Sequence, residues 1–305
     1  MRCTRKHPIM KLFRGKKEKI EDTLVTESPL RVFIDGVKVA TIVCTPHAIE
    51  YLAAGFAYSE HFIQSKNDIS GIHCDQKRGI VSMITCRHTP TATAQKDDLS
   101  RTGPGAGKNS STSDRARANN PGIASPPDTP YIDWGCFSPH NWNHCTEPPF
   151  TKAGPLKTSP EIPRNCTEVQ MQVQWEEVTG LVKQAHALSS VYRSTGGVHS
   201  AGVCTSSEVV AFYEDIGRHN AVDKVLGRCI VEGIPLHDKL LITSGRVSRT
   251  VMLKAINAGI PIIVSVSAPT FEAVTLASAC GVTLVGFARG RRMNIYTCSY
   301  RIKTN

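Results

Sequence analysis

The sequence predicts an α/β protein in which a smaller β-rich amino-terminal region precedes a layered α/β carboxy-terminal domain. Three observations point to this fold class. Residues 166–305 alternate short runs of branched apolar residues with segments of helical apolar spacing. Two further β-rich runs flank Asp35-Gly36, a sequence typical of a hairpin turn. Residues 88–165 separate the two patterns and hold twelve of the chain's 18 prolines.

The amino-terminal part divides into a tail and a β-rich region. Residues 1–22 are expected to be a mobile basic tail, because the first 19 residues carry eight Lys or Arg against one Glu. Residues 23–87 are expected to form the β-rich region with one helix. The expected elements are strands at 30–34 and 37–43, a helix over 48–62, and one or two further strands within 71–86.

Residues 88–165 differ in kind from the rest of the chain. They are rich in Pro, Ser, Thr and Asn and contain few branched apolar residues. So long a segment without periodicity predicts a flexible insertion or linker. A gene-model error that shifts the reading frame would produce a sequence of similar composition. The sequence leaves both explanations open.

Residues 166–305 are expected to form the layered domain. The expected strands are 200–204, 209–213, 239–243, 261–266 and 282–287, and the expected helices are 175–192, 221–233, 250–258 and 271–279. Strands that alternate with helices imply right-handed crossovers and a largely parallel sheet covered by helices.

Composition narrows the classes of function. The formal charge of +10 is concentrated in residues 1–19 and in residues 281–305, which suits an anionic ligand better than a nucleic-acid duplex. The longest apolar stretch, residues 259–268, is about half of the roughly 20 residues that span a bilayer. Eleven cysteines without regular spacing, and no secretory signal, predict reduced thiols and a cytoplasmic protein. We therefore expect neither a nucleic-acid nor a membrane partner.

Three loops that follow expected strands carry the candidate binding residues. Ligands of such sheets bind where loops leave the carboxyl ends of the strands. Hydroxyl-rich helix starts and glycines offer backbone N–H groups to phosphate, and arginines fork onto its oxygens. The candidates in these loops are Ser244, Gly245, Arg246, Ser267, Phe287, Ala288, Arg289, Gly290, Arg291 and Arg292. Together they predict an anionic, nucleotide-like ligand.

Two further segments add candidates. Asp215 to Lys224 enters a helix that Asn220 is expected to cap, which leaves Arg218 and His219 available for ligand contact. A glycine pair and His199 stand just ahead of another strand, although a single histidine is more often a structural residue.

Many of these segments resemble, in order, the motifs of the FdhD/NarQ family of formate dehydrogenase accessory sulfurtransferases. The resemblance covers residues 23–86 and 167–298. The matching segments are Glu27-Ser28-Pro29-Leu30, Cys44-Thr45-Pro46, Leu52 to Phe56, Ser59-Glu60, Thr195 to His199, Asp215 to Lys224, Ser244 to Arg246, Val266 to Thr270 and Val285 to Gly290.

The resemblance implies a sulfur carrier. Family members take persulfide sulfur from a cysteine desulfurase and pass it to the molybdenum bis(molybdopterin guanine dinucleotide) cofactor of a formate dehydrogenase apoenzyme. It also implies a cytidine-deaminase-like carboxy-terminal domain and contact between residues 287–292 and the cofactor, for which a guanine nucleotide would be a partial mimic. A homodimer is left open.

One departure from the family concerns its loop cysteines. Arg101 to Gly107 resembles the family's loop, but Pro104 and Gly107 stand in the two cysteine positions. A persulfide carrier needs an exposed thiolate on a mobile segment. Cys136 and Cys145 are therefore the candidate acceptors by position, in a context unlike the family's. The missing motif predicts impaired transfer, and a non-catalytic chaperone that holds the cofactor is the alternative function.

Two rival functions are disfavoured. A zinc nucleoside deaminase needs a Cys-x-x-Cys sequence, which the chain lacks. Cys136, His140, His144 and Cys145 make a poor tetrahedral zinc site in so proline-rich a stretch, and no metal site is expected.

Overall fold

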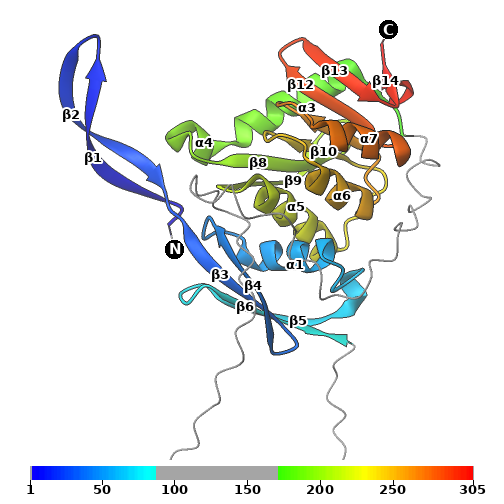
Figure 1. The fold of residues 1–305 in the computed structure, drawn as a ribbon, viewed down its shortest axis with the longest axis horizontal. Helices are drawn as coiled ribbons and strands as arrows, with labels where there is room; N and C mark the ends of the chain where they lie inside the picture. The colour runs from blue at the N-terminus through cyan, green and yellow to red at the C-terminus, as the bar shows by residue number, and fades with distance from the viewer. Residues whose placement is uncertain (1, 87–170, 305) are drawn as a thin grey trace, which may run out of the picture. The chain divides into compact units, whose positions relative to one another are not determined.

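The computed structural model describes residues 2–86 and 171–304. Its larger sheet has six strands in the order β13-β12-β11-β10-β8-β9 (Figure 1). These strands are β8 (His199–Cys204), β9 (Val209–Asp215), β10 (Leu240–Thr243), β11 (Ile262–Ser265), β12 (Thr283–Arg289) and β13 (Arg292–Thr297). The expected α/β layering of the carboxy-terminal domain is confirmed.

The sheet is mixed, whereas the sequence suggested a largely parallel one. Only the β10–β11 and β11–β12 pairs are parallel. β8 runs antiparallel to both β9 and β10, and β12 pairs antiparallel with β13. The difference arises because β8–β9 and β12–β13 are joined by short turns, and a short turn can only connect antiparallel neighbours.

Helices cover both faces of this sheet (Figure 1). Ile242 and Val264 belong to the core under α3 (Trp175–Leu188), while Leu241 and Ile263, their neighbours in sequence, belong to the core of the opposite face. Successive strand residues point to opposite faces, so both faces of β10 and β11 are buried. The opposite face carries α5 (Arg218–Glu232), α6 (Arg249–Asn257) and α7 (Phe271–Ala279).

The helix expected over residues 175–192 is divided at Ser189. α3 ends at Leu188, and a short helix, α4 (Ser190–Thr195), follows. The carboxylate of Glu214 accepts hydrogen bonds from the backbone N–H groups of Val191 and Tyr192, at 2.9 and 2.8 Å. An acidic side chain at a helix start satisfies its unpaired donors, so Glu214 fixes the beginning of α4.

The amino-terminal region contains a four-stranded sheet in the order β4-β3-β6-β5. Its core packs against α1 (Ile49–Ser59), which follows β4. The strands are β3 (Ser28–Ile34), β4 (Val37–Cys44), β5 (Ile69–Asp75) and β6 (Ile80–Thr85). The remaining short elements are the 3-10 helices η1 (Lys66–Asp68) and η3 (Ser299–Arg301), and the pair β7 (Val173–Gln174) and β14 (Ile302–Lys303). Of the helices described, none has both the length and the apolar character that crossing a bilayer requires.

Most of the expected basic tail is regular structure. β1 (Thr4–Phe13) and β2 (Lys16–Val25) form an antiparallel hairpin whose turn is Arg14-Gly15. Both turn residues have positive φ, 48° and 79°, as two-residue hairpin turns require. Opposite charges face one another across the strands, with Lys11 opposite Glu18. Most of the basic residues of this segment therefore belong to a hairpin that is exposed along most of its length.

α1 and α5 cross with their backbones in contact. A Cβ atom added to Gly227 of α5 would lie 1.9 Å from the carbonyl oxygen of Tyr51, and one added to Gly55 of α1 would lie 1.9 Å from that of Asp223. Only glycine allows so close an approach. The amino-terminal region therefore packs tightly on the carboxy-terminal domain.

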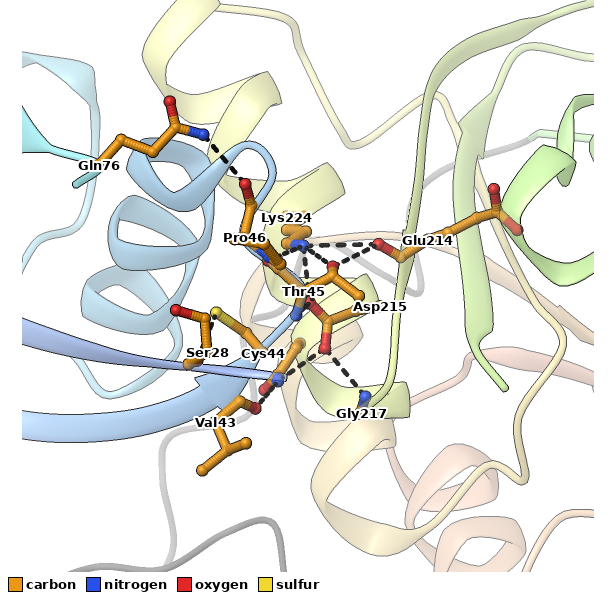
Figure 2. A network of polar contacts seen from close by, with 11 residues as sticks. Ser28, Val43, Cys44, Thr45, Pro46, Gln76, Glu214, Asp215, Gly217 and Lys224 are labelled. Carbon is orange, nitrogen blue, oxygen red and sulfur yellow. Dashed lines mark hydrogen bonds and ion pairs between the residues drawn. The ribbon is translucent and has the colours of Figure 1, made fainter. Parts of the chain in front are cut away.

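A buried ion pair lies beside this crossing (Figure 2). Lys224 Nζ lies 2.6 Å from Asp215 Oδ2, and both side chains are fully buried. The same carboxylate oxygen accepts bonds from the N–H and hydroxyl of Thr45, at 3.1 and 2.9 Å. Asp215 Oδ1 accepts bonds from Gly217 N and from Asn220 Nδ2, both at 2.9 Å. The charged groups are thus paired and hydrogen-bonded, as burial requires.

The role expected for Asn220 is wrong. The N-cap of α5 is Gly217, and Asn220 lies inside the helix. Its side-chain amide donates to Val43 O at 2.8 Å as well as to Asp215. Asn220 therefore links α5 to β4 instead of capping the helix.

A second buried ion pair involves the residue of α5 that precedes Lys224. Lys254 Nζ of α6 lies 2.7 and 2.9 Å from the two carboxylate oxygens of Asp223. Ser59 Oγ, at the end of α1, donates to the same carboxylate at 2.8 Å. Asp223 therefore joins α1, α5 and α6.

We expect Lys224→Met to lower the free energy of unfolding by about 3–5 kcal/mol, because it leaves the Asp215 carboxylate buried without its partner. Denaturant unfolding measures the change. Lys6→Met is the matched control: its exposed pair with Glu21, at 3.4 Å, should contribute less than about 1 kcal/mol. Equal effects of the two substitutions would contradict a structural role for the buried pair.

We expect Gly227→Ala to lower the free energy of unfolding by about 1–3 kcal/mol, because the added methyl group must push α1 and α5 apart. The control is Gly180→Ala in α3, where an added Cβ meets no atom within 4 Å. That control should stabilise the protein by about 0.5–1 kcal/mol, the ordinary gain for a helical glycine. Thermal unfolding of both variants distinguishes tight packing from a general intolerance of substitution.

Candidate functional site

A cavity of about 1000 Å³ lies at the carboxyl ends of β10, β11 and β12. One wall comes from α3, α4 and the two glycines before β8, and the other comes from the loops that follow the strands. The candidate residues in its lining are His199, Ser244, Ala288, Arg289 and Gly290. The edge of the sheet that the sequence singled out thus carries a large cavity.

Ser244 and His199 form one end of the cavity. The N–H of Ser244 donates to Ser200 O, and its hydroxyl accepts from Ser200 N, both at 2.9 Å. That hydroxyl lies 3.5 Å from Nδ1 of His199. Burial lowers the pKa of His199, and the charges of Arg218 and Arg246 lower it further. His199 is therefore neutral near pH 7 and can offer either a donor or an acceptor.

The other end of the cavity is the turn between β12 and β13. Gly290 has a φ of 59°, and Phe287 has a φ of 53°, which is uncommon for an aromatic residue. Phe287 N donates to Ser267 O at 3.0 Å, and Arg289 Nε donates to Val266 O at 2.9 Å. These two bonds hold the turn against the loop after β11.

The loops after β10 and β11 are also bonded to each other. Ser265 Oγ donates to Gly245 O at 2.8 Å and accepts from Ser267 N at 2.9 Å. Val247 N donates to Ala268 O at 3.1 Å. All three strand-end loops therefore form one connected rim.

Arg218 begins α5 and lies against the loop after β10. A Cβ added to Gly245 would lie 2.7 Å from Cβ and 3.2 Å from Cδ of Arg218, so the glycine makes room for this side chain. Burial lowers the pKa of Arg218, and the neighbouring charge of Arg246 lowers it further. The charges of both arginines also lower the pKa of His199.

His219 has a contact within the fold. Its Nε2 lies 3.4 Å from Oγ of Ser248, the residue that caps α6. Burial, followed by the charges of Arg218 and Lys254, lowers the pKa of His219 to about 4. His219 is not among the cavity-lining residues and contacts the start of α6 instead.

The structure brings most of the sequence candidates to one edge, but not all into the cavity. Arg218 packs against Gly245, and the charges of Arg218 and Arg246 lower the pKa of His199, but none of the three lines the cavity. Ser267 and Phe287 are bonded to each other and do not line it either. Arg291 and Arg292 are exposed at the turn and do not line the cavity. Cys136, Cys145 and the expected insertion at 88–165 lie outside the described residues.

Sequence reasoning missed the helical wall of the cavity. Lys183, His186 and Tyr192 of α3 and α4 line it, as do Gly196 and Gly197. The helical spacing in this segment predicted a helix but no ligand contact. The only available signal was the glycine pair, which lets the chain pass close to the cavity before β8.

Three of the described cysteines are too deeply buried to be reactive. Burial raises the pKa of Cys44, Cys204 and Cys229 to about 12, so they stay protonated near pH 7. Cys86 is exposed, and its thiol donates to Asn67 O at 3.0 Å. Within residues 2–86 and 171–304, no three acidic, His or Cys residues are grouped as a metal site would need.

Comparison with known proteins identifies relatives over nearly the whole chain. A protein of Bacillus subtilis named sulfur carrier protein FdhD is 32% identical, over 95% of this chain and 94% of its own length. A protein of Geobacillus kaustophilus with the same name is 32% identical, over 98% of this chain and 97% of its own length.

A solved structure shares the fold. The crystal structure of a putative formate dehydrogenase accessory protein from Desulfotalea psychrophila superposes with a TM-score of 0.68 at 19% identity, covering 99% of this chain and 100% of that one. The sequence pattern of the FdhD/NarQ family matches residues 25–129 and 152–303. On these matches, the chain belongs to the FdhD/NarQ family.

Proposed function

We propose that this chain is an accessory protein required for formate dehydrogenase activity. In this proposal it is a cytoplasmic sulfur carrier that takes persulfide sulfur from a cysteine desulfurase. It passes the sulfur to the molybdenum bis(molybdopterin guanine dinucleotide) cofactor before the cofactor enters the apoenzyme. The single observation that carries the proposal is the cavity at the strand-end loops, in a chain whose relatives are named sulfur carriers.

The chemistry of the cavity supports an anionic, nucleotide-bearing substrate. Its size is within the range of small-molecule sites, roughly 300–1000 Å³. Arg289 contributes a guanidinium at one end, and the charges of Arg218 and Arg246 act on His199 at the other. The cofactor is here a cargo, and the residues at this edge suit its phosphate and guanine parts. A guanine nucleotide should therefore bind as a partial mimic.

Sulfur transfer also requires an accessible thiolate. The buried thiols of Cys44, Cys204 and Cys229 do not meet that need, because their raised pKa keeps them protonated. Cys136 and Cys145 remain the candidate acceptors. Pro104 and Gly107, at the positions of the family's cysteines, are the observation that supports the alternative function, a chaperone that holds the cofactor without transferring sulfur.

We expect Arg289→Ala to weaken GDP binding by about 1–3 kcal/mol, the usual contribution of a charge-assisted hydrogen bond. Isothermal titration calorimetry measures the affinity. Arg78→Ala is the control, since it removes the same charge from the turn between β5 and β6, where the side chain is 77% exposed. Unchanged affinity in Arg289→Ala would exclude the β12–β13 turn from the site.

We expect a sulfur atom to be added to Cys136 or Cys145 when the protein is incubated with a cysteine desulfurase and cysteine. Mass spectrometry of the intact protein and its peptides detects the persulfide. The double variant Cys136→Ser/Cys145→Ser should lose it, whereas Cys74→Ser should keep it. If no cysteine is modified while GDP still binds, the chaperone function replaces the carrier function.

A further inference from the structure

The turn end of the β1–β2 hairpin carries an excess of positive charge. Every residue from 10 to 19 is exposed, and we call this segment the hairpin tip. Its one acidic residue is Glu18, and its five basic residues are Lys11, Arg14, Lys16, Lys17 and Lys19. The base of the hairpin, residues 4–9 and 20–25, has instead as many acidic residues as Lys and Arg residues. The positive charge of the hairpin is therefore concentrated at its tip.

Three large apolar side chains are exposed at the same tip. Met10, Leu12 and Phe13 are 53%, 66% and 62% exposed. Successive strand residues point to opposite faces, so Met10 and Leu12 lie on one face of the ribbon and Phe13 lies on the other. The register places a lysine opposite each of the three, namely Lys19, Lys17 and Lys16 in that order. Both faces of the tip thus combine apolar and cationic side chains.

The hairpin is anchored near its base. β1 and β2 form a two-stranded sheet of their own (Figure 1). Besides pairing with each other, the strands make their main contact with α4, through β2. Val25 lies at the base, and a Cβ added to Gly197, just after α4, would lie 2.9 Å from its Cγ1. A two-stranded ribbon alone is marginally stable in water, so a tip that exposes three large apolar side chains is suited to a surface from outside the described chain.

We propose that the hairpin tip binds the surface of an anionic phospholipid membrane. Leu12 and Phe13 enter the headgroup region, and the lysines lie against the lipid phosphates. Peripheral proteins bind membranes through apolar side chains at this boundary together with basic residues that anionic lipids attract. Each Lys or Arg near such a surface strengthens binding about fivefold. The inference goes beyond the proposed function and does not depend on it, since it concerns a part of the chain remote in sequence from the cavity lining.

The geometry of the tip favours lipid over a protein partner. A docked protein covers one face of a ribbon, whereas the headgroup region surrounds an inserted tip on all sides, and the apolar side chains of this tip face both ways. The edges of the ribbon carry unpaired backbone groups that need polar partners, so the tip stays among the headgroups and does not enter the hydrocarbon. The expectation of no membrane partner rested on the length of apolar stretches, which tests for a spanning segment and not for a peripheral tip.

The test is co-sedimentation of the full-length protein with lipid vesicles at low salt. One set of vesicles is phosphatidylcholine alone, and the other is an equimolar mixture of phosphatidylcholine and phosphatidylglycerol. The wild-type protein should bind the mixed vesicles at least about tenfold more tightly than the neutral ones, because several cations at the tip face the anionic lipid. Added salt should weaken this binding by screening the charges.

Apolar insertion is tested without a change of charge. Leu12→Ser/Phe13→Ser should weaken binding to the mixed vesicles at least about tenfold, because two apolar side chains no longer leave water. Leu24→Ser is the control, since it removes an exposed leucine from the base of the hairpin, and it should bind as the wild type does. Phe13→Trp should show quenching by lipids brominated near the glycerol end of their acyl chains, in excess of any quenching of the wild-type protein.

The charge of the tip is tested by a second pair of variants. Lys16→Gln/Lys17→Gln should weaken binding to the mixed vesicles by about 25-fold, the product of two fivefold effects. Lys77→Gln/Arg78→Gln is the matched control, because it removes two adjacent exposed charges from the turn between β5 and β6. That control should leave the affinity unchanged. All the substituted side chains are exposed, and thermal unfolding confirms that each variant is folded.

The outcomes separate this inference from its rivals. Absence of binding to the mixed vesicles overturns it. So does binding that Leu12→Ser/Phe13→Ser retains in full, since adsorption by charge alone then explains the result. Sedimentation velocity without vesicles detects the other kind of surface: oligomers of the wild-type protein that this variant loses, with no vesicle binding, show that the tip packs on a second copy and overturn the membrane site. GDP affinity should be equal in all tip variants and in the wild type, so failure here leaves the proposed function untouched.

Discussion

The carboxylate of Asp215 is the point on which the described structure depends most. It ends β9, holds Lys224 of α5, and accepts two bonds from Thr45, which lies between β4 and α1. A buried ion pair adds little net stability, but its geometry tolerates few alternatives once the charges are out of water. The same residue precedes the turn that leads to Arg218 at the start of α5. One interaction therefore fixes both the junction of the two regions and the beginning of α5.

The sequence predicted those parts of the fold that local patterns determine. β10 and β11 appear as continuous apolar runs because both of their faces are buried, and the hairpin at Asp35-Gly36 follows from turn chemistry. Charge composition did not reveal the hairpin within residues 1–22, since an exposed hairpin rich in lysine has the same composition as a basic tail. Strand direction was also misjudged, because periodicity identifies a strand but not the direction of its neighbour.

Only those residues of the candidate site that lie at the ends of strands could be predicted from the sequence. Ser244 follows β10 directly and Arg289 ends β12, so the rule for sheet edges predicted that both lie at the edge where the cavity is found. Lys183 and Tyr192 could not be found, because their helix reaches the cavity through tertiary packing that no local signal encodes. The role of Asn220 was misassigned for a related reason. Its partners are Val43 and Asp215, and the first of these is distant in sequence.

The backbone contact between α1 and α5 bears on how much the length of the chain between the two regions can change. Gly55, Gly227 and the hydrogen bonds from Thr45 and Ser59 to the two buried ion pairs join the regions on either side of residues 87–170. The entropy of closing a chain between two docked regions rises only slowly with the length of that chain. Changes in the number of residues between the two regions should therefore alter their docking little. The two regions should even associate when they are produced as separate polypeptides, at concentrations above the dissociation constant of their interface.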